Sequence, residues 1–224
     1  MKKSFRTTVS SPNNSTSNNN GTGVVIRLAG RAYNATSSTP ASRDYTTRKK
    51  SFPKINVTKQ GIQGDYNHYR TVALKSTPDR AVSILTSDVM ASLRATYPSY
   101  SLQDGDFGEN IYIDGISFHY FQVGKQYKFE TESKSSQAGD GKNKHGGDSS
   151  SAVIVEITEP IEPCANLCKL RYINDESLSP GDRIKRCQDF IIHLDRYDGY
   201  RGWYAKVIQE GIIGLDAQIE TLAD

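Results

Sequence analysis

Short apolar runs, each followed by turn-forming residues, recur along most of this chain. Many of them are rich in Val, Ile, Tyr and Phe, which is typical of strands. Because the runs end at Gly, Pro, Asn or Asp, they predict short strands rather than long helices. The predicted strands cover residues 23–28, 54–57, 69–74, 81–85, 109–113, 124–130 and 152–158, and the last third adds an apolar piece at 190–194, a strand at Gly202-Trp203-Tyr204 and a piece at 217–222.

One segment has a clear helical pattern. Residues 87–94 begin with Ser87 as a candidate N-cap, carry Asp88 in the first turn and place apolar residues at helical spacing. Many short strands with little helix predict a mainly β fold with one or two short helices. We expect the strands to form a closed or partly closed β-barrel.

Two segments are too polar to join a core. Residues 1–21 are Ser, Thr and Asn with almost no large apolar side chain, so burial cannot repay the cost of ordering them. Residues 133–151 are rich in Ser, Gly, Lys and Asp, which predicts a flexible insertion within a hairpin. We therefore expect a disordered tail followed by one domain at 22–224.

The bulk composition excludes some classes of function. No apolar run approaches the roughly 20 residues that span a bilayer, so we expect no membrane span. The formal net charge is +3, from 28 basic and 25 acidic residues. So small an excess gives no argument for nucleic-acid binding, and it is compatible with an anionic small molecule held by a few local Arg and Lys side chains.

The cysteine count bears on the compartment. Three cysteines argue against a disulfide framework and favour a reducing environment, so we expect a cytoplasmic protein. The first acidic residue is Asp44, and Lys2, Lys3 and Arg6 precede it, which makes the mitochondrion the alternative. However, the Arg-rich amphipathic helix of a transit peptide is missing.

Cys164 stands in the most informative segment of the chain. It follows the predicted strand at 152–158 and the break at residues 159–163, which contains Pro160 and Pro163. Proline cannot donate to a strand ladder, so the chain should leave the sheet here and place Cys164 at the rim of the fold. A thiolate there is a soft ligand suited to a redox metal. The alternative is a small buried hydrophobic residue, as free cysteine often is.

A second candidate segment is the glycine-rich stretch that contains Gly61, Gly64, Asp65, His68 and Arg70. Its glycines let backbone N–H groups approach an anion, and its basic side chains add charge-assisted donors. We expect the Asp65 carboxylate to orient this loop. The alternative is an ordinary tight turn with a structural histidine.

Four segments resemble, in the same order, motifs of the MOSC domain family: residues 61–70, 105–111, 159–164 and 202–211. This family includes the C-terminal domain of molybdenum cofactor sulfurases, the mitochondrial amidoxime-reducing components and small stand-alone bacterial proteins. The resemblance extends over about residues 22 to 222. It implies a strand-rich, barrel-like MOSC domain that binds molybdenum cofactor (molybdenum held by molybdopterin).

The resemblance also implies roles for particular residues. It makes Cys164 the catalytic residue and the protein ligand of molybdenum. The terminal phosphate of molybdopterin calls for cations, and the pterin calls for groups that both donate and accept hydrogen bonds. The family's Asp-x-His spacing is stretched here to residues 65–68. The implied cofactor-binding residues are Gly64, His68, Arg70, Gly108, Asn110 and Arg201.

The function implied by the resemblance is reduction of N-hydroxylated compounds such as amidoximes and hydroxylamines. An external electron-donor protein would be required, because the chain has no recognisable flavin or haem site and three cysteines cannot furnish a Cys₄ cluster. The alternative is a carrier of sulfur or cofactor that works through a persulfide on Cys164 without redox turnover. No pyridoxal phosphate site is visible, since no lysine has a motif context for a Schiff base.

A zinc site formed by Cys164, Cys168, Cys187 and His193 is a further alternative. Their spacing is irregular compared with the paired short spacings of structural zinc sites. We expect Cys187 to be a thiol without chemical consequence.

Overall fold

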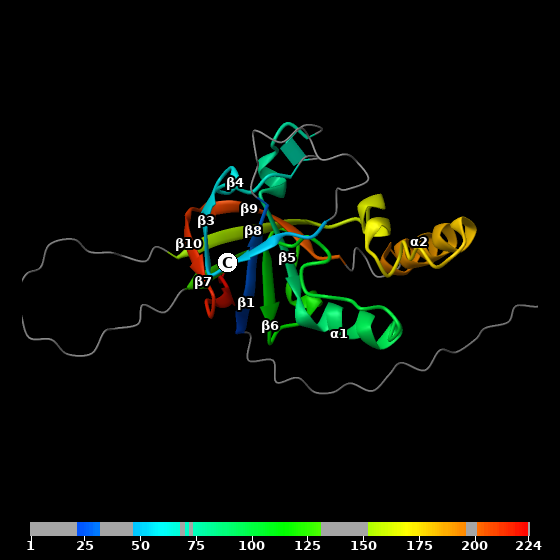
Figure 1. The fold of residues 1–224 in the computed structure, drawn as a ribbon. Helices are drawn as coiled ribbons and strands as arrows, with labels where there is room; N and C mark the ends of the chain where they lie inside the picture. Colours follow the sequence, from blue (N-terminus) through cyan, green and yellow to red (C-terminus); the bar gives the residue numbers. More distant parts are fainter. Residues whose placement is uncertain are drawn as a thin grey trace, which may run out of the picture.

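Seven strands of the main sheet form a closed barrel (Figure 1). The computed structural model describes residues 22–31, 47–67, 70–71, 74–130, 152–195 and 201–223. The strand order is β11-β7-β8-β9-β5-β6-β1, and pairing of β1 with β11 closes the ring, with Gly23 opposite Ile219. The predicted mainly β, barrel-like fold is therefore confirmed. The barrel strands are β1 (Gly23–Gly30), β5 (Val82–Thr86), β6 (Ile111–Asp114), β7 (Gln126–Glu130), β8 (Val153–Pro160), β9 (Trp203–Gln209) and β11 (Gln218–Thr221), and β2 (Lys50–Phe52) pairs with the end of β1.

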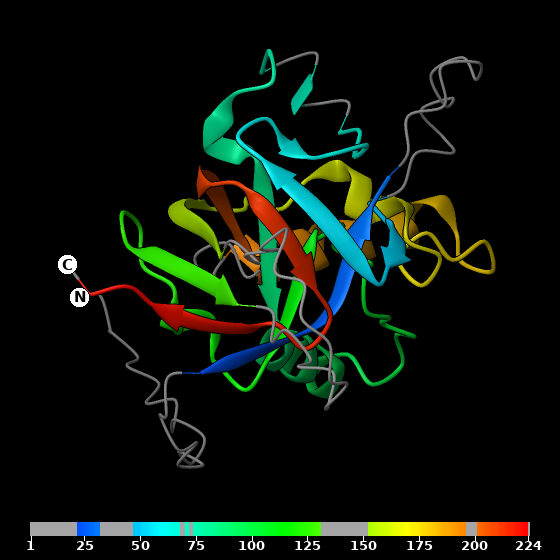
Figure 2. The same cartoon turned by 90° about the vertical axis from the view of Figure 1, so that its left-hand side faces the viewer.

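A smaller sheet continues from the barrel, because β9 runs directly into β10 (Gly211–Gly214). Its order is β10-β3-β4, with β3 at Lys54–Thr58 and β4 at Gly61–Ile62 (Figure 2). Residues alternate between exposed and buried along β3, so Ile55 and Val57 face inward. The strand predicted at 54–57 is confirmed and extends one residue further, to Thr58.

The helix α1 (Ser87–Thr96) connects β5 to β6, which run parallel. A parallel pair requires such a crossover. The predicted helix is confirmed, but Thr86 rather than Ser87 is its N-cap. The carboxylate of Asp88, in the first turn, accepts the N–H of Val89 at 2.9 Å and the N–H of Phe118 at 2.9 Å.

The sequence analysis did not predict α2 (Pro180–Asp195), which contains the apolar piece at 190–194. A start signal was present: Ser179 Oγ accepts the N–H of Asp182 at 3.2 Å, and Pro180 opens the helix. Only Phe190 and Leu194 of α2 are buried, so its apolar stripe is narrow. Three short 3₁₀ helices complete the described helices: η2 (Pro78–Arg80), η3 (Phe118–Tyr120) and η4 (Ala165–Lys169).

The strand predicted at 69–74 is wrong where the structure describes it. The N–H of Thr71 donates to the carbonyl of Asn67 at 2.8 Å, which is a helical turn, and Leu74 lies in a bend. The tail at 1–21 and the insertion at 133–151 lie outside the described residues. The flanking strands β7 and β8 pair antiparallel as a hairpin, with Gln126 opposite Glu156.

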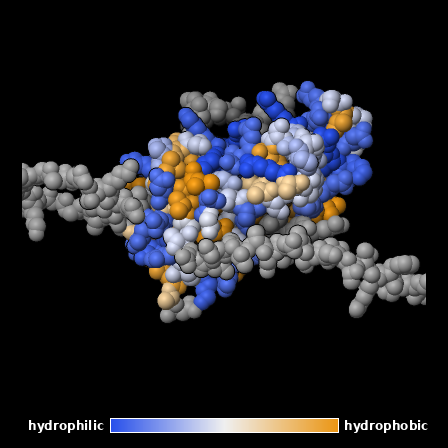
Figure 3. Space-filling model, turned by 90° about the horizontal axis from the view of Figure 1, so that it is seen from below, coloured by the Kyte–Doolittle hydropathy of each residue, from blue (hydrophilic) through white to orange (hydrophobic). Residues whose placement is uncertain are grey.

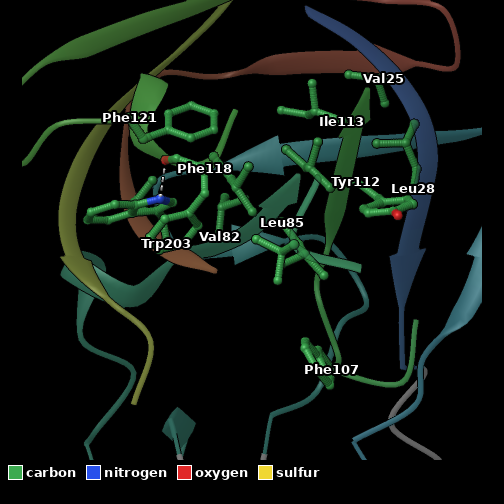
Figure 4. Packing of buried hydrophobic residues seen from close by; sticks show 14 of the residues in the cluster. Val25, Leu28, Val82, Leu85, Phe107, Tyr112, Ile113, Phe118, Phe121 and Trp203 are labelled. Carbon is green, nitrogen blue, oxygen red and sulfur yellow. Dashed lines mark hydrogen bonds between the residues drawn. The ribbon is translucent and has the colours of Figure 1, made fainter. Parts of the chain in front are cut away.

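Aromatic side chains fill one end of the barrel core (Figure 4). Trp203 stacks on Phe118 with ring centroids 4.8 Å apart, and its indole N–H donates to the Phe118 carbonyl at 3.0 Å. A buried indole needs such a partner for its only polar atom. Phe121 and Tyr127 form the adjoining pair, so the start of β9 is anchored to η3 and β7.

The outer surface is mainly hydrophilic in the view from below, with apolar side chains gathered in patches (Figure 3). The exposed large apolar residues include Ile212 on the small sheet and Ile184 on α2. No helix in the described ranges combines the length and the apolar character needed to cross a membrane.

We predict that Ile84→Ala will lower the free energy of unfolding by about 2–5 kcal/mol, since Ile84 is fully buried in β5 and truncation leaves a cavity. Chemical denaturation will measure the change. The matched control is Ile212→Ala, whose side chain is 57% exposed and whose truncation should cost less than about 1 kcal/mol. Equal losses in the two variants would contradict the central position of β5.

Candidate functional site

A cavity of about 330 Å³ lies at the end of the barrel where β1 and β8 end and β6 and β9 begin. We call it the Cys164 cavity. Segments far apart in the sequence contribute its walls, which makes it a product of the tertiary fold. Its lining residues are Arg31, Thr47, Lys49, Tyr66, Asn67, Arg80, Gly108, Glu162, Pro163, Cys164, Ala165, Asn166, Arg201 and Tyr204.

Cys164 lies in the cavity wall as a free, half-buried thiol. It precedes η4 as its N-cap residue and has an extended backbone conformation. β8 runs to Pro160, two residues beyond the predicted strand, and the N–H of Ile161 still donates to the Gly202 carbonyl at 2.8 Å. The chain then leaves the sheet, so the Pro-containing break places the thiol at the rim.

Basic side chains outnumber acidic ones around the cavity. Arg31, Lys49, Arg80 and Arg201 line it, and among the described lining residues Glu162 is the one carboxylate. A concave site with this excess of positive charge attracts anions.

Arg201 is the cation with unused hydrogen-bonding capacity. Its Nη1 donates to the Glu162 carbonyl at 3.0 Å and its Nη2 to the Phe107 carbonyl at 3.4 Å. Its buried Nε has no hydrogen-bond partner among the described residues. Buried polar groups normally find partners, so this N–H is a place where a ligand oxygen can bind.

A buried ion pair forms the floor. Lys49 Nζ lies 2.8 Å from Asp65 Oδ2, and the two side chains are 7% and 9% exposed. Burial lowers the pKa of Lys49, and attraction to Asp65 offsets this only in part. Burial also acts to raise the pKa of Asp65, but the charge of Lys49 and hydrogen bonds from Lys49, Asn110 and the Arg31 N–H outweigh it and hold the pKa below its ordinary value.

Asn110 supports this floor and does not line the cavity. Its Nδ2 donates to Asp65 Oδ2 at 2.9 Å and to the Ala29 carbonyl at 3.0 Å. Its Oδ1 accepts the Ser83 hydroxyl at 2.8 Å and the Ser83 N–H at 3.2 Å. The amide predicted to bind cofactor therefore uses its hydrogen-bonding capacity inside the protein, and its link to the cavity runs through Asp65 to Lys49.

Glu109 and Gly108, the two residues before Asn110, both help to position the segment at 47–49, Glu109 through Arg27 and Gly108 directly. Glu109 accepts a hydrogen bond from Arg27 Nη1 at 2.8 Å, and Arg27 Nη2 donates to the Lys49 carbonyl at 2.8 Å. Burial raises the pKa of Glu109, and the charge of Arg27 opposes this rise. Gly108 has φ +78°, and a Cβ there would lie 2.6 Å from the Thr47 carbonyl oxygen. Only glycine allows this close approach.

The glycine-rich stretch lies mostly beside the cavity. Arg70 is not among the lining residues; its guanidinium donates to the carbonyls of Gln60 at 2.6 Å and Thr77 at 3.2 Å. Gly64 lines a separate hollow next to the small sheet. His68 lies outside the described residues. Asp65 orients the loop, as expected, by accepting the Arg31 N–H at 2.6 Å.

Of the residues predicted for the site, the structure thus brings together Cys164, Gly108 and Arg201. The sequence analysis missed Lys49, Arg31, Arg80 and Tyr204. Lys49 stands in the basic run at 48–50, and nothing local to that run shows which side chain turns inward. The signal for Tyr204 was its alternation with Trp203, which packs in the core and leaves the tyrosine facing the cavity.

The zinc alternative is not supported. Cys168 and Cys187 form a disulfide with their Cα atoms 5.1 Å apart, so neither sulfur is a free thiolate. The part of the chain that the structure describes contains no cluster of three or more potential metal-ligating side chains. The prediction that Cys187 is a thiol without chemical consequence is wrong, because η4 and α2 bring it against Cys168.

We predict that Asp65→Asn will destabilise the fold by about 3–5 kcal/mol, because it leaves the Lys49 ammonium buried without its counter-charge. Chemical denaturation at several pH values will measure this. The folded-state pKa of Asp65 is depressed, so its contribution is complete above the unfolded value of about 3.9 and is lost as pH falls through the lower folded value. The difference between wild type and variant should therefore shrink below about pH 4.

The matched control for this prediction is Asp189→Asn, which breaks the exposed Lys185–Asp189 pair on α2. Exposed pairs contribute little, so the control should leave stability unchanged. An equally stable Asp65→Asn variant would show that the buried pair does not support the floor.

Comparison with known proteins gives a family and a fold. A family model described as the MOSC domain matches residues 71–220. No curated protein matches the sequence. Among solved structures, YuaD of Bacillus subtilis has a TM-score of 0.60 at 15% identity, covering 88% of this chain and 94% of that one.

Two further structures share the fold. YiiM of Escherichia coli has a TM-score of 0.50 at 20% identity, covering 81% of this chain and 68% of that one. YiiM of Geobacillus stearothermophilus has a TM-score of 0.52 at 16% identity, covering 89% and 74%. At these identities the likeness concerns the fold alone. The family match, which spans more than half of the sequence, shows that this chain belongs to the MOSC domain family.

Proposed function

We propose that this protein binds molybdenum cofactor in the Cys164 cavity and reduces N-hydroxylated small molecules. The observation that carries the proposal is a free thiol in the wall of a cavity whose cations outnumber its carboxylates. Membership of the MOSC domain family supports the same cofactor.

The residues present fit this group chemically. A thiolate is a soft ligand that suits a redox metal, and Cys164 is the free cysteine of the chain. The phosphate of molybdopterin needs charge-assisted donors, which Arg201 and Lys49 would provide from the lining of the cavity. The unpartnered Nε of Arg201 adds a donor that an anionic oxygen would satisfy.

When bound, the cofactor would supply the two-electron chemistry that cleavage of an N–O bond requires. The chain itself would hold the metal through Cys164 Sγ and the phosphate through its cations. Tyr204 lines the same cavity, and burial raises the pKa of its hydroxyl, although Arg201 and Arg80 oppose the rise. Tyr204 would therefore be a neutral hydrogen-bond donor in the cavity.

Electrons would come from a separate donor protein. Two of the three cysteines are paired with each other, which leaves too few thiolates for an iron–sulfur cluster of this chain's own. The substrate would be a small molecule, since the cavity volume of about 330 Å³ is shared with the cofactor.

We predict that Cys164→Ser will lose molybdenum while keeping the fold, because a serine hydroxyl is a poor soft ligand. The measurement is metal content by plasma mass spectrometry on protein made in a host that synthesises the cofactor, with circular dichroism as the check on folding. A serine variant that retains the metal of the wild type would sink the assignment. A wild-type protein without molybdenum but with one added sulfur atom on Cys164, seen by intact mass, would instead indicate a sulfur carrier.

We also predict that Arg201→Gln will weaken cofactor retention about tenfold or more, since a charge-assisted hydrogen bond contributes about 1.5–3 kcal/mol. Pterin fluorescence after oxidation of the purified variants will measure the retained cofactor. Arg70→Gln is the discriminating variant, because its guanidinium is bound to backbone carbonyls outside the cavity. Loss in Arg70→Gln with retention in Arg201→Gln would place the phosphate at the glycine-rich stretch instead.

A further inference from the structure

The disulfide between Cys168 and Cys187 joins two elements that the barrel strands do not include. Cys168 lies in η4 and Cys187 in α2, 19 positions later. Their Cα atoms are 5.1 Å apart, within the range that a disulfide spans without backbone movement. Both residues are half-buried against the edge of the core, so the bond does not lie in the fully buried interior.

This bond lies close to the Cys164 cavity along the chain. Cys164 is the N-cap of η4, and its carbonyl accepts the N–H of Leu167 at 3.0 Å. Ala165 and Asn166, in the same helix, line the cavity. A movement of η4 would therefore move both the thiol and the adjoining wall.

The elements that the disulfide joins lie outside the barrel, with α2 projecting away from it (Figure 1). They have other contacts: Leu167 and Phe190 are buried in the core, and Arg186 Nη1 donates to the Tyr172 carbonyl at 2.9 Å. Loss of the disulfide should therefore loosen η4 on α2 without opening the barrel.

We propose that Cys168–Cys187 is a reversible redox clasp that fixes the cavity wall carrying Cys164. A dithiol reductant donates two electrons and two protons: one of its thiolates attacks a protein sulfur, the S–S bond breaks, and its second thiol then closes the reductant's own disulfide. The protein is left with two thiols and a mobile η4. A small-molecule disulfide or diamide restores the bond and the rigid wall, because it accepts the two electrons and two protons that the thiols release.

The test uses the full-length protein and needs no metal. Alkylation followed by intact mass should count one reactive thiol in the oxidised protein, Cys164, and all three after treatment with dithiothreitol. Hydrogen exchange at the amides of 165–169 should become about tenfold faster on reduction, while exchange in β5 and β8 stays unchanged. The double variant Cys168→Ser/Cys187→Ser should exchange like the reduced protein and should not respond to dithiothreitol.

Two results would overturn the clasp: three reactive thiols in protein oxidised with diamide, or equal exchange at 165–169 in both redox states. Cys164→Ser is the matched control, because it keeps the disulfide and should show the same redox response as wild type. Since neither readout involves molybdenum or turnover, failure of the clasp leaves the proposed function standing. Failure of the proposed function likewise leaves the clasp standing.

Discussion

A buried ammonium needs a counter-charge, and the arrangement around Lys49 follows from this constraint. Asp65 supplies the charge, and the loop of the glycine-rich stretch must fold back to the end of β1 to deliver it. Asn110 must stand between Asp65 and Ser83 to hold that carboxylate. One ion pair thus fixes the relative positions of β1, β5 and the start of β6. Asp65 and Asn110, which belong to segments that resemble ligand-binding motifs, thus serve mainly to keep this ion pair buried and in place.

The sequence predicted much of the barrel and part of the site. Strands such as β3 and β8 were predictable because alternation and β-branched runs are local signals, and the Pro-containing break correctly located the exit of the chain before Cys164. Residues 69–74 were predicted to form a strand because their apolar residues are typical of strands. The hydrogen bond from the Thr71 N–H to the Asn67 carbonyl shows a helical turn there instead. The helix α2 was missed because it buries few side chains, so its apolar residues show only a weak helical periodicity. The cap at Ser179 was a recognisable signal for its start.

The site could be predicted only in part because its geometry comes from contacts between distant segments. Arg70 and Arg201 are equally basic in the sequence and both donate to backbone carbonyls, yet only Arg201 of the two lines the cavity. Lys49 turns inward because Asp65 lies opposite, which no pattern within 48–50 encodes. The cavity combines a floor formed by the segments next to β2 and β4 with a wall, η4, that follows β8.

The pairing of β1 with β11 also sets the order in which this molecule can form. Gly23 pairs with Ile219, so the two strands that close the ring come from near opposite ends of the described chain. Until β11 has left the ribosome, β1 has an unpaired edge, and the segments of the cavity have no closed barrel to hold them in register. A ring closed by two strands this far apart in the sequence depends on a long-range pairing, so folding is expected to be slow and to finish only once β11 is available. During that interval, a chaperone that shields β1 would protect the edge strand most open to aggregation.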